Sequence, residues 1–278
     1  QSKKAVPTYR TTFIDTSIKY AEEIIITNST ESVINHEKVI DDFHKLLPLR
    51  DQFIDWILLE VEMSTQDIPE IFQNNSFLEK LLSFRNLSDK NKHGLYDAAG
   101  LFMYEIFLYI IAILLKHEKF NTIKKVFTNS YLLDDLVLFG EFNFRSEALE
   151  KRKESLSLNR LSLIGDIFKD RSTRLDISFN ELMEAEAIIC IYTFISDKAN
   201  LYWYPNTLVY ARYTLRFPFL IRCKQHSYFK NLAFIMDKPS GDDLRKKFYA
   251  EIAKHSYIHQ LFQFALFPID LSELDTID

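Results

Sequence analysis

The sequence predicts a mainly α-helical fold, an irregular bundle of many helices, and three observations support this. Glycine is rare and large aromatics are abundant: the 278 residues include five Gly, 24 Phe and 14 Tyr. Helix-capping patterns recur, and apolar residues follow most of them at spacings of three and four. Because the five glycines are isolated, no two can cooperate in a phosphate-binding loop, which argues against P-loop, dinucleotide-binding and kinase folds.

Capping patterns and apolar periodicity define the elements in order. An N-cap oxygen followed by an acid three residues later satisfies two backbone N–H groups at a helix start. This pattern occurs at Asp67/Glu70, Ser76/Glu79, Ser178/Glu181 and Ser240/Asp243. Apolar periodicity predicts further helices near residues 13–26, 32–47, 49–63, 98–117, 119–128, 146–170 and 226–236.

The helical interpretation is least direct at residues 186–223. This region is rich in β-branched and aromatic residues, so a few short strands are an alternative there. We expect helix for its first part, because that part continues the capped run from Ser178. The second part, YWYPNTLVYARYTLRFPFLIR, stays open because Pro205 and Pro218 interrupt it.

The length allows one helical domain over residues 1–278, or two subdomains divided near residues 140–146. Residues 268–278 are acidic and are expected to form a docked or frayed tail. The two cysteines, Cys190 and Cys223, lack CxxC spacing, which favours buried free thiols in a reducing compartment. We therefore expect a cytoplasmic protein.

Charge and hydropathy restrict the partners. The net charge is −5 and no basic tract is present, which disfavours nucleic acid. Residues 101–115, LFMYEIFLYIIAILL, are nearly all apolar. A membrane span needs about 20 apolar residues, so we expect a buried central helix and no membrane association.

One candidate metal site follows from helical spacing. Glu251, His255 and His259 are four residues apart, so on one helix they would share a face. Two histidines at that spacing can chelate Zn²⁺. In the metalloprotease motif a glutamate directly follows the first histidine, but here that position is Ser256, so an ordinary exposed face is favoured. The sequence indicates no other cofactor.

A helical RNase of the HEPN type is the enzymatic alternative. Such enzymes use an arginine, a polar residue and a histidine separated by four to six residues. The chain offers Arg85 with His93, seven residues between them, and Arg222 with His226, three between them. Neither pair fits this spacing, so RNase activity is disfavoured.

Ionisable residues in apolar helices are the candidate binding residues. Glu105 lies in the most apolar segment, where an unpaired carboxylate is costly. Arg160 falls on the apolar side of the predicted helix 146–170, so we expect Glu105 to pair with Arg160 or Arg145. Such a pair either fixes helix register or, with Asn159 and Asp166, forms a small polar pocket.

An aromatic cluster at residues 202–205 is a further candidate. Its Trp203 could stack on a base or hold a partner's side chain. Anchoring a loop to the core is the commoner use of such a cluster, and we interpret it as structural.

Four stretches resemble helical regions of bacterial proteins that carry a TIR-like or SEFIR-like signalling domain at their other end. These stretches, within residues 104–234, are YEIFLYIIAILLKHEKF, SLNRLSLIGDIFKDR, ISFNELMEAEAIICIY and YWYPNTLVY. The resemblance implies an immune or antiphage protein in which this part senses, oligomerises or regulates. No βαβ alternation or catalytic glutamate context is present, so the resemblance assigns no catalytic residue.

Together these observations predict a non-catalytic helical module of a bacterial defence or signalling protein. It would bind a protein partner or itself and control an effector domain, with a small-molecule or nucleotide ligand left open. A helical enzyme and a purely structural subunit are the alternatives.

Overall fold

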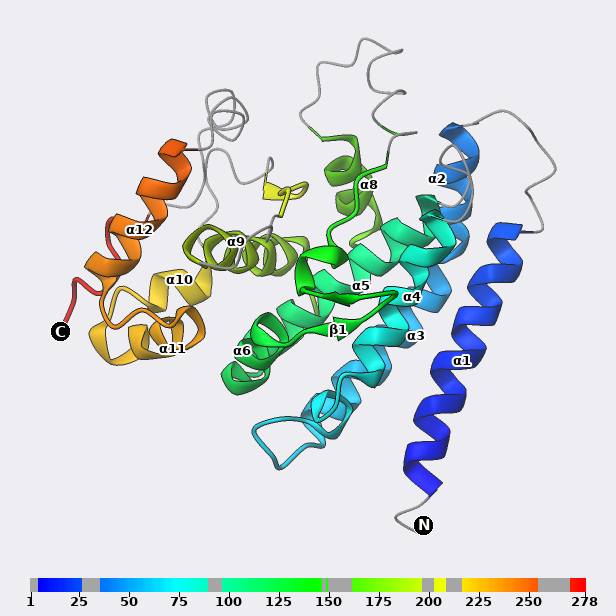
Figure 1. Cartoon of the computed structure of the whole chain (residues 1–278), viewed down its shortest axis with the longest axis horizontal. Coiled ribbons are helices and arrows are strands. Elements are labelled where there is room, and N and C mark those ends of the chain that lie inside the picture. Colours follow the sequence, from blue (N-terminus) through cyan, green and yellow to red (C-terminus); the bar gives the residue numbers. More distant parts are fainter. Residues whose placement is uncertain are drawn as a thin grey trace.

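The computed structural model describes residues 5–26, 36–89, 97–146, 149, 162–196, 203–208, 217–254 and 271–278. These residues form eleven α-helices, two 3-10 turns and one small pair of strands. The predicted mainly α-helical, multi-helix fold is therefore confirmed (Figure 1).

The central element is α5 (Asp97–Lys116), whose residues are all buried except Lys116. Four helices that precede it in the chain pack on or around it: α1 (Ala5–Ile26), α2 (His36–Lys45), α3 (Leu47–Glu62) and α4 (Ser76–Asp89). The helix α1 also contacts α2 and α4, and in Figure 1 it lies at the edge of the molecule.

The second half of the chain continues the packing around α5. Its helices α6 (Phe120–Thr128) and α9 (Phe179–Ile195) both contact α5. Helices α11 and α12 pack on α9, and α11 also packs on α6. The remaining bounds are α8 (Leu163–Arg171), α10 (Pro218–Arg222), α11 (His226–Met236) and α12 (Gly241–Lys254).

The hydropathy of α5 matches a membrane span in length and composition. It is the one helix of that kind among the described residues, and its apolar window is completely buried inside the protein. Its apolar side chains therefore pack against other helices, as expected for the core helix of a soluble protein.

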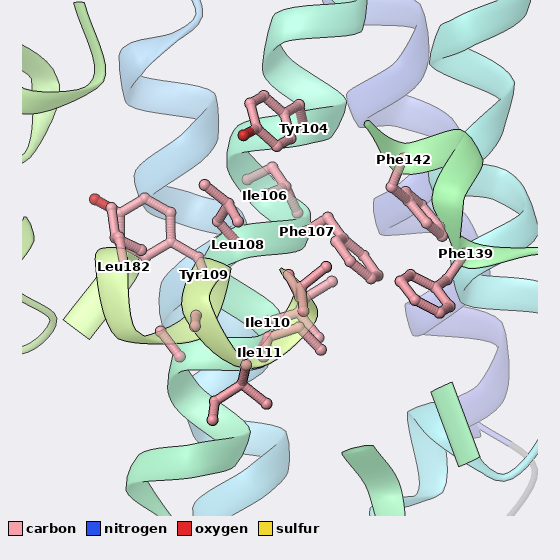
Figure 2. Close-up of a cluster of buried hydrophobic side chains, with 14 of the residues drawn as sticks. Tyr104, Ile106, Phe107, Leu108, Tyr109, Ile110, Ile111, Phe139, Phe142 and Leu182 are labelled. Carbon is pink, nitrogen blue, oxygen red and sulfur yellow. The ribbon is translucent and has the colours of Figure 1, made fainter. Parts of the chain in front are cut away.

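Aromatic rings fill much of the space around α5. The ring of Phe107 stacks on Phe142, with centroids 4.2 Å apart and planes inclined by 6°. Phe142 belongs to the 3-10 turn η2 (Phe139–Phe142), which covers this side of α5 (Figure 2). The side chain of Trp203 also packs against Phe107. The core thus uses the aromatic surplus seen in the sequence.

The small sheet was not predicted where it occurs. It pairs β1 (Tyr131–Leu132) with β2 (Leu136–Val137) in antiparallel orientation. In the region 186–223, residues up to Ile195 continue α9, as expected, and residues 203–208 are irregular, so the alternative of strands is not observed in these parts. Residues 197–202 and 209–216 lie outside the described residues.

The capping box before α9 is confirmed and explains its helical state. The Ser178 hydroxyl accepts from Glu181 N–H (3.3 Å), and Glu181 Oε2 accepts from Ser178 N–H (2.7 Å). At the start of α12, the Ser240 hydroxyl accepts from Asp243 N–H (3.2 Å).

Two predicted capping boxes are wrong. No α-helix begins at Asp67; Pro69 instead precedes a short 3-10 turn, η1 (Glu70–Phe72). The helix α4 does begin at Ser76, but the Glu79 carboxylate accepts from Leu132 N–H (2.9 Å) on β1. A tertiary contact therefore replaces the local cap.

Other boundaries agree with expectation to within a few residues. The exceptions are α1, which begins before the expected residue 13, and the predicted helix 146–170. Of the latter, the structure describes α8 at its end, while 150–161 lie outside the described residues. The subdomain boundary near 140–146 falls at η2 and remains a prediction.

Removing the Phe107 ring should test the aromatic core. We expect Phe107→Ala to lower the free energy of unfolding by about 3–5 kcal/mol, because it leaves a cavity beside buried rings. Chemical denaturation monitored by circular dichroism measures this. The matched control is Phe234→Ala on α11, where the ring is 42% exposed and the cost should be about 1 kcal/mol or less. Equal losses would contradict the assignment of Phe107 to the core.

Candidate functional site

Glu105 lies in the middle of α5 and binds two buried arginines. Arg171, at the end of α8, donates from Nε to Oε1 (3.1 Å) and from Nη2 to Oε2 (2.7 Å). Arg50 of α3 donates from Nη1 to Oε1 (3.3 Å). All three side chains are at most 1% exposed. Two positive charges thus surround one carboxylate in the protein interior.

The two arginines also bind backbone groups of other segments. Arg50 Nη1 donates to the carbonyl of Arg171 (2.7 Å), and Arg171 Nη1 donates to the carbonyl of Phe43 in α2 (2.6 Å). The guanidinium of Arg171 also lies 3.7 Å from the centroid of the Phe43 ring. Because each partner is fixed from several directions, this cluster joins α2, α3, α5 and α8.

A second set of charges connects this cluster to the surface. Arg50 Nη2 donates to Asp51 Oδ1 (2.6 Å), and this carboxylate lies 3.5 Å from Arg174. Arg174 in turn binds Asp55 (2.6 Å) and Asp176. The hydrogen bond from Arg174 lowers the pKa of Asp176. The second positive charge in the core is thus balanced by a carboxylate nearer the surface.

The expected partners of Glu105 require correction. Arg145 is exposed and lies over the ring of Tyr204, with its guanidinium 5.5 Å from the centroid, so it does not reach Glu105. Arg160 and Asn159 lie outside the described residues. Both oxygens of Glu105 are bound by Arg171 and Arg50. The sequence did not identify these two arginines as the partners.

Asp166 is the other described residue that the sequence suggested for a polar pocket around Glu105. It is half-buried in the first turn of α8, whereas the arginine that binds Glu105 stands at the end of that helix. The observed arrangement at Glu105 is a closed ion-pair cluster rather than the small polar pocket considered from the sequence.

Glu186 of α9 forms a second buried site, also missed from the sequence. Its carboxylate is 0% exposed. Oε1 accepts from Trp203 Nε1 (3.1 Å), Asn206 N–H (3.1 Å) and the Tyr104 hydroxyl. Oε2 accepts from Thr207 N–H (2.6 Å) and from the hydroxyl of the same residue. Five neutral donors therefore bind this carboxylate and hold residues 203–208 against α5 and α9.

Helix α8 also packs closely against residues 203–208. A Cβ added to Gly165 would lie 2.3 Å from the carbonyl oxygen of Asn206, so no larger residue fits. Ser162 caps α8 by accepting from Gly165 N–H (2.9 Å), and its hydroxyl lies 3.3 Å from Asn206 Oδ1. Segment 203–208 is thus fixed from both sides.

These contacts bury the Trp203 side chain and leave it a structural role. The indole is 1% exposed, its N–H donates to Glu186, and its ring packs against Tyr104 and Phe107. A base or a partner's side chain has no exposed ring to stack on. The residue anchors segment 203–208, as its structural interpretation predicts.

Glu184, one turn before Ile188 on α9, is a further buried carboxylate. It is 6% exposed, and its Oε1 accepts from Phe219 N–H (2.6 Å) at the start of α10. Burial raises the pKa of Glu184 to about 7, against the opposing effect of the backbone N–H groups of Phe219 and Leu220. This carboxylate therefore titrates near neutral pH and joins α9 to α10.

The metal hypothesis concerns α12. Glu251 binds Lys254 (2.7 Å) and Lys247 (3.3 Å), and the hydrogen bond from Lys254 lowers its pKa. His255 and His259 lie outside the described residues, so their placement relative to Glu251 remains a prediction. Within the described ranges, no group of three His, Cys, Asp or Glu side chains is placed to hold a metal ion.

The cysteines are free and buried, as expected. Burial raises the pKa of Cys190 well above its ordinary value and also raises that of Cys223. Both are therefore thiols at neutral pH and poor nucleophiles.

The surface also carries a polar groove of about 500 Å³ between α1, the end of α3 and η1. Its Arg10 binds Glu60 (2.6 Å) and Glu70 (2.7 Å), so the guanidinium is already engaged. The lining is otherwise mainly hydroxyl and amide groups.

The sequence does contain a signal for the two buried carboxylates that its interpretation missed. Glu184 and Glu186 interrupt an apolar run just as Glu105 does, and each proves to be a buried carboxylate that accepts hydrogen bonds from another segment. Comparison with known proteins adds nothing to this geometry, because no protein-family model, curated protein or solved structure matches the chain.

Glu105→Gln should test the ion-pair cluster. We expect a loss of about 3–5 kcal/mol in the free energy of unfolding, because the buried Arg171 guanidinium loses its counter-charge and Arg50 loses one of its two carboxylate partners. Urea denaturation measures this. The control is Glu118→Gln, which alters an ion pair with Arg222 whose side chains are about half exposed and should cost about 1 kcal/mol or less. A small effect of Glu105→Gln would mean that the cluster is not under the charge constraint described.

Glu184→Gln should change how stability depends on pH. In the unfolded chain this carboxyl titrates near its ordinary pKa, whereas the folded chain keeps the proton up to about pH 7. Wild-type stability should therefore fall as pH rises between these two values, by up to about 1.4 kcal/mol per pH unit from this group. The Glu184→Gln variant should lack this part of the decrease in stability with rising pH.

The comparison is made by measuring unfolding free energies of both proteins at several pH values. At about pH 4 both side chains are neutral, so the two proteins should be similarly stable. The variant should then gain relative to wild type as pH rises to about 8. Parallel curves over this range would contradict a raised pKa at Glu184.

Proposed function

We propose that this chain is a non-catalytic helical module that associates with itself or with a protein partner and thereby controls an effector. The observation that carries the proposal is the state of its buried acids. Glu105, Glu186 and Glu184 are each bound by groups from other segments of the chain. Such contacts stabilise the arrangement of helices, whereas a general acid or base needs access to a substrate.

The residues considered for RNase chemistry support the same proposal. Arg85 binds the carboxylate of Glu141 (3.0 Å) and its carbonyl (2.7 Å). Arg222 binds Glu118 (2.8 Å), while His226 binds Asp275 (2.6 Å). The arginine and histidine of the second pair therefore have separate partners. His93 lies outside the described residues.

The biological setting rests on the sequence resemblance. The stretches similar to helical regions of TIR-like and SEFIR-like proteins favour a bacterial antiphage or signalling protein, acting in the cytoplasm. In that setting a helical region without its own chemistry would transmit assembly to an effector domain. A small-molecule or nucleotide ligand would act through the same assembly.

Two measurements on the purified chain test the proposal. Sedimentation velocity over a wide concentration range should reveal reversible self-association, or pull-down with cross-linking should recover a defined protein partner. Incubation with structured and unstructured RNA should leave the RNA intact. RNA cleavage that disappears in Arg85→Ala, with no association, would instead support the helical enzyme.

A further inference from the structure

Residues 271–278 form a short segment that is bound by the rest of the protein. Leu271 is 0% exposed and Leu274 is 2% exposed, although the segment has no regular secondary structure of its own. Figure 1 shows it beside α12. Burying two leucines contributes about 1.5–3 kcal/mol each, so this is a specific docking interaction. The acidic tail expected from residue 268 onward is therefore docked in its described part.

The backbone of the segment pairs with the residues between α10 and α11. Asp275 N–H donates to the carbonyl of Cys223 (3.0 Å), and Ile277 N–H donates to that of Lys224 (2.9 Å). In return, His226 N–H donates to the carbonyl of Ile277 (2.7 Å). Gln225 and Ile277 form a parallel bridge. Backbone pairing of this kind, continued over more residues, is how extended peptides are recognised at a strand edge.

The Asp275 carboxylate contacts two further groups of the protein. Its Oδ2 accepts from Gly241 N–H (3.1 Å) at the start of α12, and its Oδ1 lies 2.6 Å from His226 Nδ1. A carboxylate at a helix start is favoured by the helix dipole. The backbone of Asp275 has φ of 57°, so the chain turns sharply to reach both groups.

Side chains of α12 bind the other end of the segment. Arg245 Nη1 donates to the carbonyl of Leu274 (2.5 Å) and lies 3.4 Å from that of Leu271. The hydroxyl of Tyr249 accepts from Leu271 N–H (3.3 Å). Backbone, leucine and carboxylate groups of the segment thus all have dedicated partners.

Gly241 makes this close approach possible. A Cβ at this position would lie 2.8 Å from Asp275 Cβ and 2.9 Å from the carbonyl oxygen of Leu274. Both distances are shorter than van der Waals contact, so a larger residue would displace the segment. One of the five glycines in the chain is therefore used at the docking surface.

We propose that this surface, formed by residues 223–226 and 241–249, also accepts the 271–278 segment of a second copy of the chain. Every contact described above joins the segment to that surface, so an exchanged segment would make the same contacts. Exchange of identical elements is a low-cost route to dimers. The proposal rests on the self-association proposed above and gives it a mechanism.

Chain length allows this exchange. Lys254, at the end of α12, and Leu271 are separated by sixteen residues in the sequence. A connection of that length can span at most about 55 Å. The length of the connection therefore does not restrict the segment to the surface of its own chain.

Two full-length variants test the exchange in a mixing experiment. Gly241→Leu blocks the surface and keeps the segment, whereas Leu274→Asp disables the segment and keeps the surface. The variants carry donor and acceptor dyes, and energy transfer is measured for each alone and for the mixture. Transfer in the mixture, with none for either variant alone, is the expected result, because only the mixture pairs an intact surface with an intact segment.

A peptide of residues 271–278 provides an independent measurement should Gly241→Leu fail to fold, which circular dichroism would reveal. Fluorescence anisotropy should detect its binding to the Leu274→Asp protein. Binding to wild type should be at least about tenfold weaker, since the resident segment competes at high effective concentration. The same peptide with Leu274→Asp should bind about 10- to 100-fold more weakly than the unaltered peptide.

The outcomes separate this inference from the proposed function. No transfer in a mixture of folded variants, or no peptide binding, would overturn segment exchange. If wild type nevertheless self-associates in sedimentation, the proposed function survives through another surface. If wild type does not associate and the peptide does not bind, both self-association and exchange are wrong.

Discussion

The arrangement of helices depends on how one carboxylate is neutralised inside an apolar helix. Glu105 interrupts α5, the most hydrophobic element, and its charge is matched by Arg50 and Arg171 from two other helices. A buried charge is tolerated only when its partners are present and correctly oriented. The position of α3 and α8 on α5 is therefore coupled to this cluster, which selects one packing among the many that apolar side chains alone would permit.

Glu186 and Glu184 repeat the principle on α9 with different partners. Glu186 uses neutral donors from the irregular segment 203–208, and so replaces the hydrogen bonds that regular secondary structure would supply. Glu184 receives a backbone N–H of α10 and remains partly protonated near neutral pH. In all three cases an acid in an apolar run fixes an element distant in sequence. Polar groups provide specificity, while aliphatic side chains and aromatic rings around α5 provide the buried apolar surface.

The segment 271–278 extends this mode of construction to the surface. It is bound by backbone pairing, two buried leucines and a carboxylate at a helix start, much as one protein recognises a short peptide of another. The buried acids described above are bound within the chain, whereas the docking surface uses contacts that an identical segment could also make. This contrast is the reason that we propose association, rather than chemistry at the buried acids, as the role of this fold.

The sequence by itself determined the helical class, the central apolar helix and the capped start of α9, because these depend on periodicity and on local hydrogen bonds. It also indicated that Glu105 must be paired. Only the tertiary structure decided that Arg50 and Arg171 are the partners, and that Glu79 binds β1 instead of capping its own helix. These contacts join residues 53 to 66 positions apart, and sequence spacing carries no information on which distant helix will supply a charge or an N–H group.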